Sequence, residues 1–294
     1  MILVTGANGP FGRLVVEQLL ARIPAADLAV SVRDPAAAAP LEAQGVRVRH
    51  GDFNEPASLA EAFAGADTVF VNGTNYGTAS ASRAGQHAAA IRAAREAGAS
   101  RIVYTSWQNL DDCALEMAAD FAGTEKLLTE SGASGEPCPA WTILRTTIGM
   151  AQSLARDVHW AKAAGELAAP AGDAHATPAA VPDLAEAAAN VLTEFGHDNQ
   201  VYELSSPDSL TWHDLAALAT DLGDRQIRYR AISDDEARAQ AVAAGFQPAS
   251  AEMLISYYAA FRAGWANSPS ADLSRLLRRP ATSALEAVRL AVEL

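Results

Sequence analysis

The stretch MILVTGANGPFG at residues 1–12 decides the fold, because a short apolar run passes directly into a glycine-rich turn. Residues 2–6 predict a buried strand, and residues 10–22 carry apolar side chains at helical spacing. Gly6, Gly9 and Gly12 stand where the strand turns into the helix. Glycines there permit a tight turn, close approach of the main chain to a pyrophosphate and close packing of helix on strand. The G-x-x-G-x-x-G spacing is a one-residue variant of the dinucleotide-binding fingerprint, so we predict nucleotide binding.

Outward from this turn, the first half of the chain alternates short apolar runs with helical patterns. Further strands are predicted at 28–33, 46–50, 67–72, 101–106 and 141–145, and further helices at 35–44, 56–65, 79–97 and 121–131. This alternation is typical of parallel βαβ units with right-handed crossovers. We therefore expect an α/β fold with a Rossmann-type, doubly wound parallel sheet.

The pattern is less regular after residue 146. It predicts a helix at 181–193, strands at 201–205 and 226–232, and mostly helix from residue 234 onward. Thr211 and Asp214 have the spacing of a capping box at the start of another helix. We expect a cofactor-binding Rossmann domain over 1–146. Residues 147–294 should form mainly a smaller α/β C-terminal substrate lobe, interlocked with the first because no composition shift marks a linker.

The composition restricts the possible partners. The net charge is −13, and no cluster of Lys and Arg appears, so neither nucleic acid nor a polyanionic membrane surface is expected as a partner. No apolar segment is long enough to cross a bilayer, and no signal peptide precedes the first strand. We expect a cytoplasmic protein, monomeric or homodimeric, with a small-molecule substrate.

The cysteines and histidines do not predict a metal site. Cys113 and Cys138 are too far apart for a CxxC pair, and the six histidines are scattered. Two reduced thiols are the simpler interpretation, and a single disulfide between them stays open.

The end of the second predicted strand bears on the choice of coenzyme. An acidic residue at this place would bind a ribose 2′-hydroxyl, whereas an arginine suits the 2′-phosphate of NADP. Arg33 ends the strand, while Asp34 precedes Pro35 and fits a helix N-cap. We therefore favour NADP (NADPH), with a solvated surface arginine as the alternative for Arg33.

Several ordered motifs together resemble the NmrA-like atypical short-chain dehydrogenases. They are MILVTGANGPFG (1–12), SVRDP (31–35), VRVRHGDFNEPASLAEAFAGAD (46–67), AAREAGASRIVYTS (93–106), GTEKLLTESG (123–132), TILR (142–145) and the segment 191–216. Within that family they are most similar to the bacterial NADPH:quinone oxidoreductase type 2 and triphenylmethane reductase group. The resemblance covers roughly residues 1–230, and more weakly the rest.

The resemblance implies cofactor-binding roles for residues that match the family motifs. These residues are Gly6, Asn8, Gly9, Pro10, Phe11 and Gly12 for the pyrophosphate, Arg33 for the 2′-phosphate, Asp52 and Phe53 beside the adenine, Val71, Asn72 and Gly73 beside the nicotinamide ribose, and Thr105 and Lys126.

For catalysis, Lys126 is the first candidate and Ser106 the second, as polar groups beside the nicotinamide. Alternatively, Lys126 is a solvated lysine and Ser106 a strand-end serine that satisfies the backbone. An apolar substrate pocket is predicted from Trp107, Ile148, Met150 and Trp160, although such side chains are more often core.

Ala122 stands where ordinary short-chain dehydrogenases carry the tyrosine of a Tyr-x-x-x-Lys pair. The chain also departs from the resembled family, because residues 146–150 lack the family's Asn and aromatic residue and residues 134–139 lengthen a loop. We expect an NADPH-dependent oxidoreductase that transfers hydride to a small conjugated or aromatic acceptor, such as a quinone, dye or enone. The alternatives are a non-catalytic NADP-binding redox sensor of the NmrA type and a biosynthetic reductase of the same fold.

Overall fold

The computed structural model describes residues 1–74, 80–130 and 139–293. Its main feature is a seven-stranded sheet with strand order β3-β2-β1-β4-β5-β6-β9. These strands are β1 (Ile2–Thr5), β2 (Leu28–Val32), β3 (Arg47–His50), β4 (Thr68–Val71), β5 (Arg101–Trp107), β6 (Ala140–Thr146) and β9 (Gln200–Leu204). Neighbours from β3 to β6 pair in parallel. The predicted doubly wound α/β sheet is therefore confirmed.

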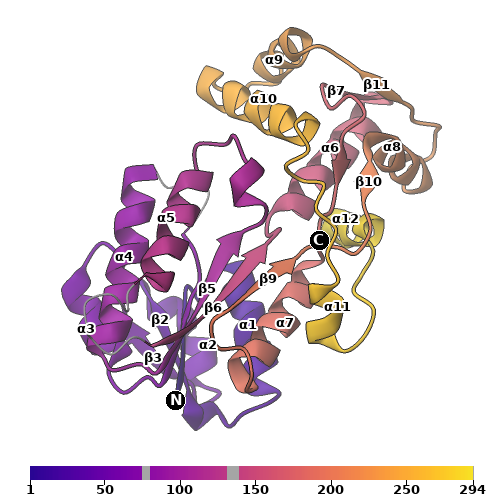
Figure 1. Cartoon of the computed structure of the whole chain (residues 1–294). Helices are drawn as coiled ribbons and strands as arrows, with labels where there is room; N and C mark the ends of the chain where they lie inside the picture. The colour runs from indigo at the N-terminus through magenta and orange to yellow at the C-terminus, as the bar shows by residue number, and fades with distance from the viewer. Residues whose placement is uncertain (75–79, 131–138, 294) are drawn as a thin grey trace. The chain divides into compact units, whose positions relative to one another are not determined.

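Helices cover both faces of this sheet. The helices are α1 (Pro10–Leu20), α2 (Ala39–Glu42), α3 (Pro56–Phe63), α4 (Ser80–Glu96), α5 (Ala118–Thr129) and α7 (Val181–Thr193). Figure 1 shows α4 and α5 on one face, and α1 and α7 on the other. Strands buried on both faces read as continuous apolar runs, and every residue of β2 is buried. Since the strands run in parallel, their carboxyl ends meet at one edge of the sheet.

The chain forms two compact units and passes repeatedly between them. The first comprises Met1–Trp107, Glu116–Thr146 and Pro182–Glu203, and the second comprises Gln108–Leu115, Thr147–Val181 and Leu204–Leu294. One unit boundary coincides with the division predicted after residue 146. The return of 182–203 to the first unit brings α7 to the sheet and adds β9 to its edge. That the second unit binds substrate stays a prediction.

The second unit is mostly helical. Its helices are α6 (Met150–Ala164), α8 (Trp212–Asp221), α9 (Asp234–Ala243), α10 (Pro248–Arg262), α11 (Asp272–Leu277) and α12 (Ala284–Val292). Two small sheets pair β10 (Leu210–Thr211) with β8 (His175–Ala176) and β11 (Tyr229–Ala231) with β7 (Leu167–Ala169). The predicted capping box is confirmed, since Thr211 N donates to Asp214 Oδ2 (2.8 Å) and Asp214 N to Thr211 Oγ1 (3.3 Å).

The second unit contains one long helix, α6, that the sequence patterns did not predict. Gly149 and Gly165 bound it, both in the left-handed region with φ of 86° and 85°. Of the other predicted elements, the helix at 35–44 is a short 3-10 turn (Ala36–Ala38) followed by α2, and the strand at 226–232 extends only over β11.

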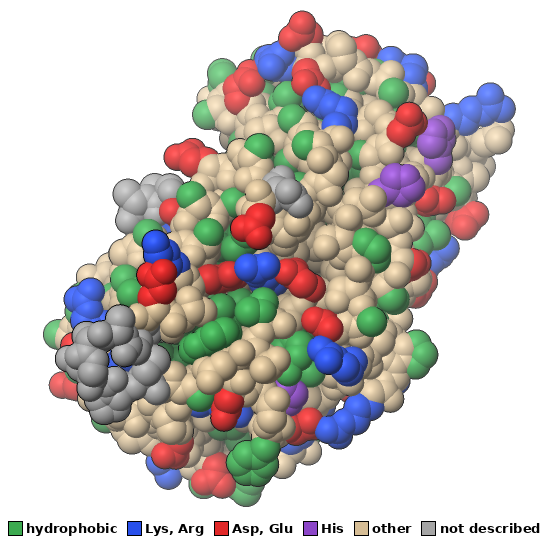
Figure 2. All heavy atoms as spheres, in the orientation of Figure 1, with side chains coloured by type: hydrophobic (Ala, Val, Ile, Leu, Met, Phe, Trp, Pro, Cys, Tyr) green, Lys and Arg blue, Asp and Glu red, His purple; other side chains and the backbone are tan. Residues whose placement is uncertain are grey.

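The surface carries both signs of charge. Figure 2 shows acidic and basic side chains interspersed on one face. Among the described residues, no helix combines the length and apolar character needed to cross a membrane.

Candidate functional site

The turn between β1 and α1 is built from bare main chain. Gly6 has a φ of 67°, and Gly9 N donates to Gly6 O over 3.0 Å, which closes the turn. A Cβ atom on Gly12 would lie 2.4 Å from Gly6 O, a contact that only movement of the backbone could relieve. The turn therefore requires glycine at position 12, as the sequence analysis predicts.

The start of α1 suits an anion. Gly9 is the N-cap residue and supplies no side-chain hydrogen bond, Pro10 occupies the first turn, and no acidic residue lies in that turn. Unsatisfied N–H groups and the positive end of the helix dipole are then available to a phosphate. Asn8 Nδ2 donates to Asp34 O over 2.9 Å and ties the turn to the end of β2.

Arg33 and Asp34 differ in their contacts at the end of β2. The Arg33 side chain is exposed and has no hydrogen bond or ion pair to any described residue. The Asp34 carboxylate accepts a hydrogen bond from Ala36 N over 3.0 Å, although the N-cap of the following 3-10 turn is Pro35, one residue after the predicted cap. The guanidinium of Arg33 is thus available to a ligand, whereas Asp34 has a local structural role.

Residues that follow β3 and β4, together with Thr105 of β5, contribute polar groups to the same edge of the sheet. Asp52 Oδ1 accepts from both N and Nδ2 of Asn54, at 2.9 and 3.1 Å. Thr105 Oγ1 accepts from Gly73 N (2.8 Å) and donates to Asn72 Oδ1 (3.2 Å). Phe53 is half-buried beside Asp52, and the Val71 side chain is fully buried, so Val71 could offer a ligand only its main chain.

Asn72 connects this edge to the glycine turn. Thr5 Oγ1, at the end of β1, accepts from Asn72 N over 2.9 Å. The Asn72 Nδ2 atom would lie 3.3 Å from a Cβ placed on Gly6. The predicted pyrophosphate turn and the predicted ribose contact are therefore adjacent in the structure. Phe11, by contrast, is buried and its ring packs 6.3 Å from that of Phe70, which is a core contact.

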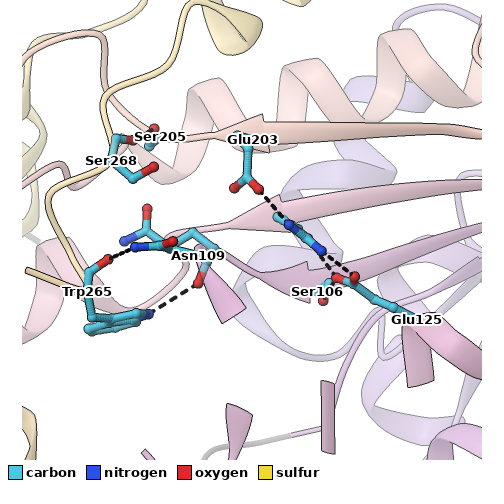
Figure 3. Close-up of polar contacts among 9 residues, drawn as sticks. Ser106, Asn109, Glu125, Glu203, Ser205, Trp265 and Ser268 are labelled. Carbon is cyan, nitrogen blue, oxygen red and sulfur yellow. Dashed lines mark hydrogen bonds and ion pairs between the residues drawn. The ribbon is translucent and has the colours of Figure 1, made fainter. Parts of the chain in front are cut away.

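A partly buried ionic network lies at the ends of β5 and β6 (Figure 3). Ser106 Oγ donates to Glu125 Oε1 over 2.5 Å. Arg145 binds the same carboxylate through Nε (3.0 Å) and Nη2 (2.7 Å), and its Nη1 donates to Glu203 Oε1 (2.9 Å). The hydrogen bond to Glu125 is the largest influence that raises the pKa of Arg145. The network ties helix α5 to three strands of the sheet.

The structure does not place Lys126 beside Ser106. The Lys126 side chain is 70 % exposed on α5, and its Nζ lies 3.9 Å from Glu130 Oε1. The preceding residue, Glu125, is the one that faces inward and is only 8 % exposed. A cofactor contact by Lys126 stays a prediction, while the partner of Ser106 is Glu125, a residue that the sequence patterns did not single out.

A second buried network of hydrogen bonds, which the sequence patterns did not predict, fixes the turn after β4. Thr74 N donates to His87 Nε2 over 3.3 Å, so that nitrogen is an acceptor and the proton lies on Nδ1, 3.0 Å from Thr124 Oγ1. Burial, and then the charge of Arg83, lower the pKa of His87 to about 4. The Tyr104 hydroxyl lies 3.2 Å from His87 Nδ1, and burial raises its pKa. Neutral His87 thus fixes the turn that carries Asn72 and Gly73.

The predicted substrate residues belong to both compact units, with Trp107 in the first and the other three in the second. Trp107 is buried in the first unit, with its ring 5.9 Å from that of Phe121. Ile148 is half-buried, and Met150 is buried at the start of α6. Trp160 lies ten residues farther along α6, about 15 Å by helix rise, and is 40 % exposed. Substrate contacts by Trp107, Ile148, Met150 and Trp160 stay predictions.

Two features of the sequence analysis lie partly or wholly outside the described residues. The lengthened loop at 134–139 is described only at Pro139. Cys138 is also outside, and Cys113 is a free thiol within the described chain. In that same part of the chain, no three His, Cys, Asp or Glu side chains are grouped to hold a metal ion.

Comparison with known proteins agrees with this geometry. Residues 6–194 match the family model described as NAD(P)H-binding. The chain is 34% identical over 289 residues to quinone oxidoreductase 2 of Escherichia coli strain K12, covering 98% of this chain and 97% of that protein. The E. coli NADPH-dependent quinone oxidoreductase complexed with NADPH has a TM-score of 0.89 and 32% identity, with 99% of each chain covered. For Citrobacter sp. triphenylmethane reductase complexed with NADP(H), the values are 0.87, 32% and 99% of each chain.

Proposed function

This chain belongs to the NAD(P)H-binding family, and from that premise we propose that it is an NADPH-dependent oxidoreductase acting on quinone- or dye-like acceptors. The observation that carries the proposal is the bare turn at Gly6–Gly12, in which a single Cβ at position 12 would collide with Gly6 O. Such a turn fits the pyrophosphate of a dinucleotide. The free guanidinium of Arg33 supports the 2′-phosphate of NADPH as the distinguishing group.

Each group at the carboxyl edge would then have a defined part in binding. The N–H groups at the start of α1 would bind the pyrophosphate, Asp52 and Phe53 would lie beside the adenine, and the Asn72–Gly73 turn would contact the nicotinamide ribose. The bound nicotinamide supplies the hydride. The protein positions it, and the network of Thr5, Asn72 and Thr105 makes that position rigid.

The lack of a suitable proton donor favours an acceptor that can take up a hydride without receiving a proton in the same step. Ala122 stands where the acid of ordinary short-chain dehydrogenases would stand. Tyr104 is fully buried against His87, and its raised pKa makes it a poor proton donor. Ser106 donates to a buried carboxylate, so it could offer an acceptor a hydrogen bond only by leaving Glu125. Quinones and cationic dyes meet this requirement better than simple ketones.

The test is consumption of NADPH by the purified protein with a soluble quinone, a cationic triarylmethane dye and a simple ketone. We expect turnover with the first two and little with the ketone. Gly12→Val is the matched negative control, since it removes the proposed pyrophosphate site. Turnover by Gly12→Val equal to that of the wild type would show that the activity arises elsewhere.

The second candidate is a non-catalytic NADP-binding sensor. The missing tyrosine and the segment 146–150, without the family's polar and aromatic pair, favour it. Tight NADPH binding with no consumption across the acceptor panel would support the sensor and contradict the reductase. A cytoplasmic location and a monomeric or homodimeric state remain part of the proposal.

A further inference from the structure

A cavity of about 200 Å³ lies within the second unit, lined by residues of α6, β7, α9 and α10. None of its lining residues is a candidate for binding the cofactor. Small side chains account for the open space, because Ala161, Ala164, Ala237 and Ala241 all face it. Among the described residues, no larger side chain fills this space, so it can admit a ligand.

Aromatic side chains form part of the cavity wall. The rings of Trp160 and Phe246 meet edge to face, with centroids 5.8 Å apart, and Tyr258 also lines the cavity. Trp160 is 40 % exposed, so this part of the cavity wall also faces solvent. Such walls favour an apolar ligand with a flat ring.

The Asp157 carboxylate lines this largely apolar space, together with the polar side chains of Glu166 and Gln240. Asp157 is 4 % exposed, and its Oδ2 accepts from Trp212 Nε1 (2.9 Å) and Tyr258 OH (2.8 Å). Its Oδ1 is buried and receives no hydrogen bond from the described residues. Arg156 Nη2 lies 3.6 Å from Oδ1, and the Arg156 guanidinium is stacked 4.9 Å over the Trp160 ring. A buried acceptor without a donor is unfavourable, so a donor from a ligand would be stabilised here.

The charge of the side chains that line the cavity favours a cationic group as the ligand's hydrogen-bond donor to Asp157. Among the described residues, the charged side chains that line the cavity are Asp157 and Glu166, both acidic. Glu166 pairs with Arg230 over 3.0 Å at the surface, whereas Asp157 is buried and its nearest cation, Arg156, lies at the longer distance of 3.6 Å. A cationic group near Asp157 would also face aromatic rings that attract cations.

We propose that this cavity is a second ligand site, which binds a small protonated aromatic amine. Its ammonium group donates to Asp157 Oδ1, and its ring packs among Trp160, Phe246 and Leu254. This inference does not depend on the proposed reductase activity, because the site lies wholly within the second unit.

The experiment is a calorimetric titration of the full-length protein with phenethylamine, without nucleotide. We expect saturable binding with one site per chain, and affinity for the uncharged phenethyl alcohol lower by about tenfold or more. Asp157→Asn should weaken phenethylamine binding by a similar factor. No saturable heat with the wild type, or equal affinity for amine and alcohol, would overturn the proposal.

A second variant, Ala244→Leu, tests the proposal even if Asp157→Asn does not fold. Ala244 lines the cavity and is exposed, so Ala244→Leu narrows the space without overpacking a core. We expect it to abolish phenethylamine binding while NADPH binding is retained. Val242→Leu is the matched control, because Val242 is exposed nearby and does not line the cavity. Equal amine affinity in Ala244→Leu and Val242→Leu would place any binding elsewhere.

Discussion

Glu125 and Arg145 form a partly buried, bidentate ion pair, with Oε1 and Oε2 of the carboxylate at 3.0 and 2.7 Å from Nε and Nη2 of the guanidinium. The pair joins α5 to the end of β6, and Ser106 at the end of β5 donates to the same carboxylate. The planar guanidinium binds both carboxylate oxygens through a fixed pair of N–H groups, a geometry that the ammonium of lysine does not provide.

Removing one charge from this pair should destabilise the fold. In Glu125→Gln, Arg145 keeps only Glu203 as a carboxylate partner in a half-buried place. We expect the free energy of unfolding in urea to fall by about 3 kcal/mol. Lys126→Ala is the matched control on the next residue, expected to change stability by less than about 0.5 kcal/mol because its pair with Glu130 is exposed. Equal losses in the two variants would refute the inward orientation of Glu125.

Arg33 should determine coenzyme preference. Because its guanidinium has no partner among the described residues, Arg33→Ala should leave stability unchanged. NADPH affinity should fall by about tenfold or more, the loss of a charge-assisted contact, while NADH affinity hardly changes. Titrations of both coenzymes into both proteins measure this, and parallel losses would remove Arg33 from the 2′-phosphate site.

Gly12 should tolerate no side chain. Gly12→Ala brings a Cβ to 2.4 Å from Gly6 O, so the turn must shift, and NADPH binding should be lost or nearly so. Gly123→Ala is the control, since Gly123 is an exposed helical residue with open space around it. That change should stabilise the protein by about 0.5–1 kcal/mol through helix propensity. Unchanged NADPH affinity in Gly12→Ala would contradict the close approach of main chain and pyrophosphate.

His87 should make the fold sensitive to mild acid. Its pKa in the folded protein is about 4, against 6.5 for an unperturbed histidine. The unfolded chain therefore binds this proton at higher pH, and stability falls as pH drops from 6.5 toward 4. Between pH 7 and pH 5 we expect a loss of about 2 kcal/mol from this residue. Urea unfolding at both values should show a smaller loss in His87→Gln, and an identical pH dependence would exclude His87 as the cause.

Burial of the Gln108 side chain should lower the stability of the folded protein. Its side chain is fully buried, and neither amide atom has a hydrogen-bond partner among the described residues. Gln108→Leu should therefore raise the free energy of unfolding, by about 1 kcal/mol. Gln44→Leu, at an exposed position, serves as the control and should have little effect. A loss of stability in Gln108→Leu would mean that water or a ligand satisfies this amide.

The sheet was predictable because its strands are continuous apolar runs. Strands β1 to β6 lie within one or two residues of their predicted bounds, since apolar runs bounded by Gly, Pro or polar residues leave few alternatives. Helix α6 was missed because many of its inward residues are alanines, which give a weak periodic signal, and because Asp157 is buried among them. The flanking Gly149 and Gly165 were the available signal.

The site was predictable only where backbone chemistry determines it. Gly6 and Gly12 are forced by local geometry, and a motif reports them. Glu125 and His87 depend on partners such as Arg145 and Tyr104, which are distant in sequence, and no local pattern identifies them. On α5, the neutral residues Ala122, Gly123 and Thr124 do not distinguish the inner face from the outer, so Lys126 was as plausible as Glu125.

The central claim is that this turn binds the pyrophosphate of NADPH, and calorimetry tests it most directly. Titration of NADPH into the wild-type chain should give saturable heat with one site per chain, and titration into Gly12→Val should give none. Absence of heat with the wild type, or equal heat with the correctly folded variant, would contradict the account.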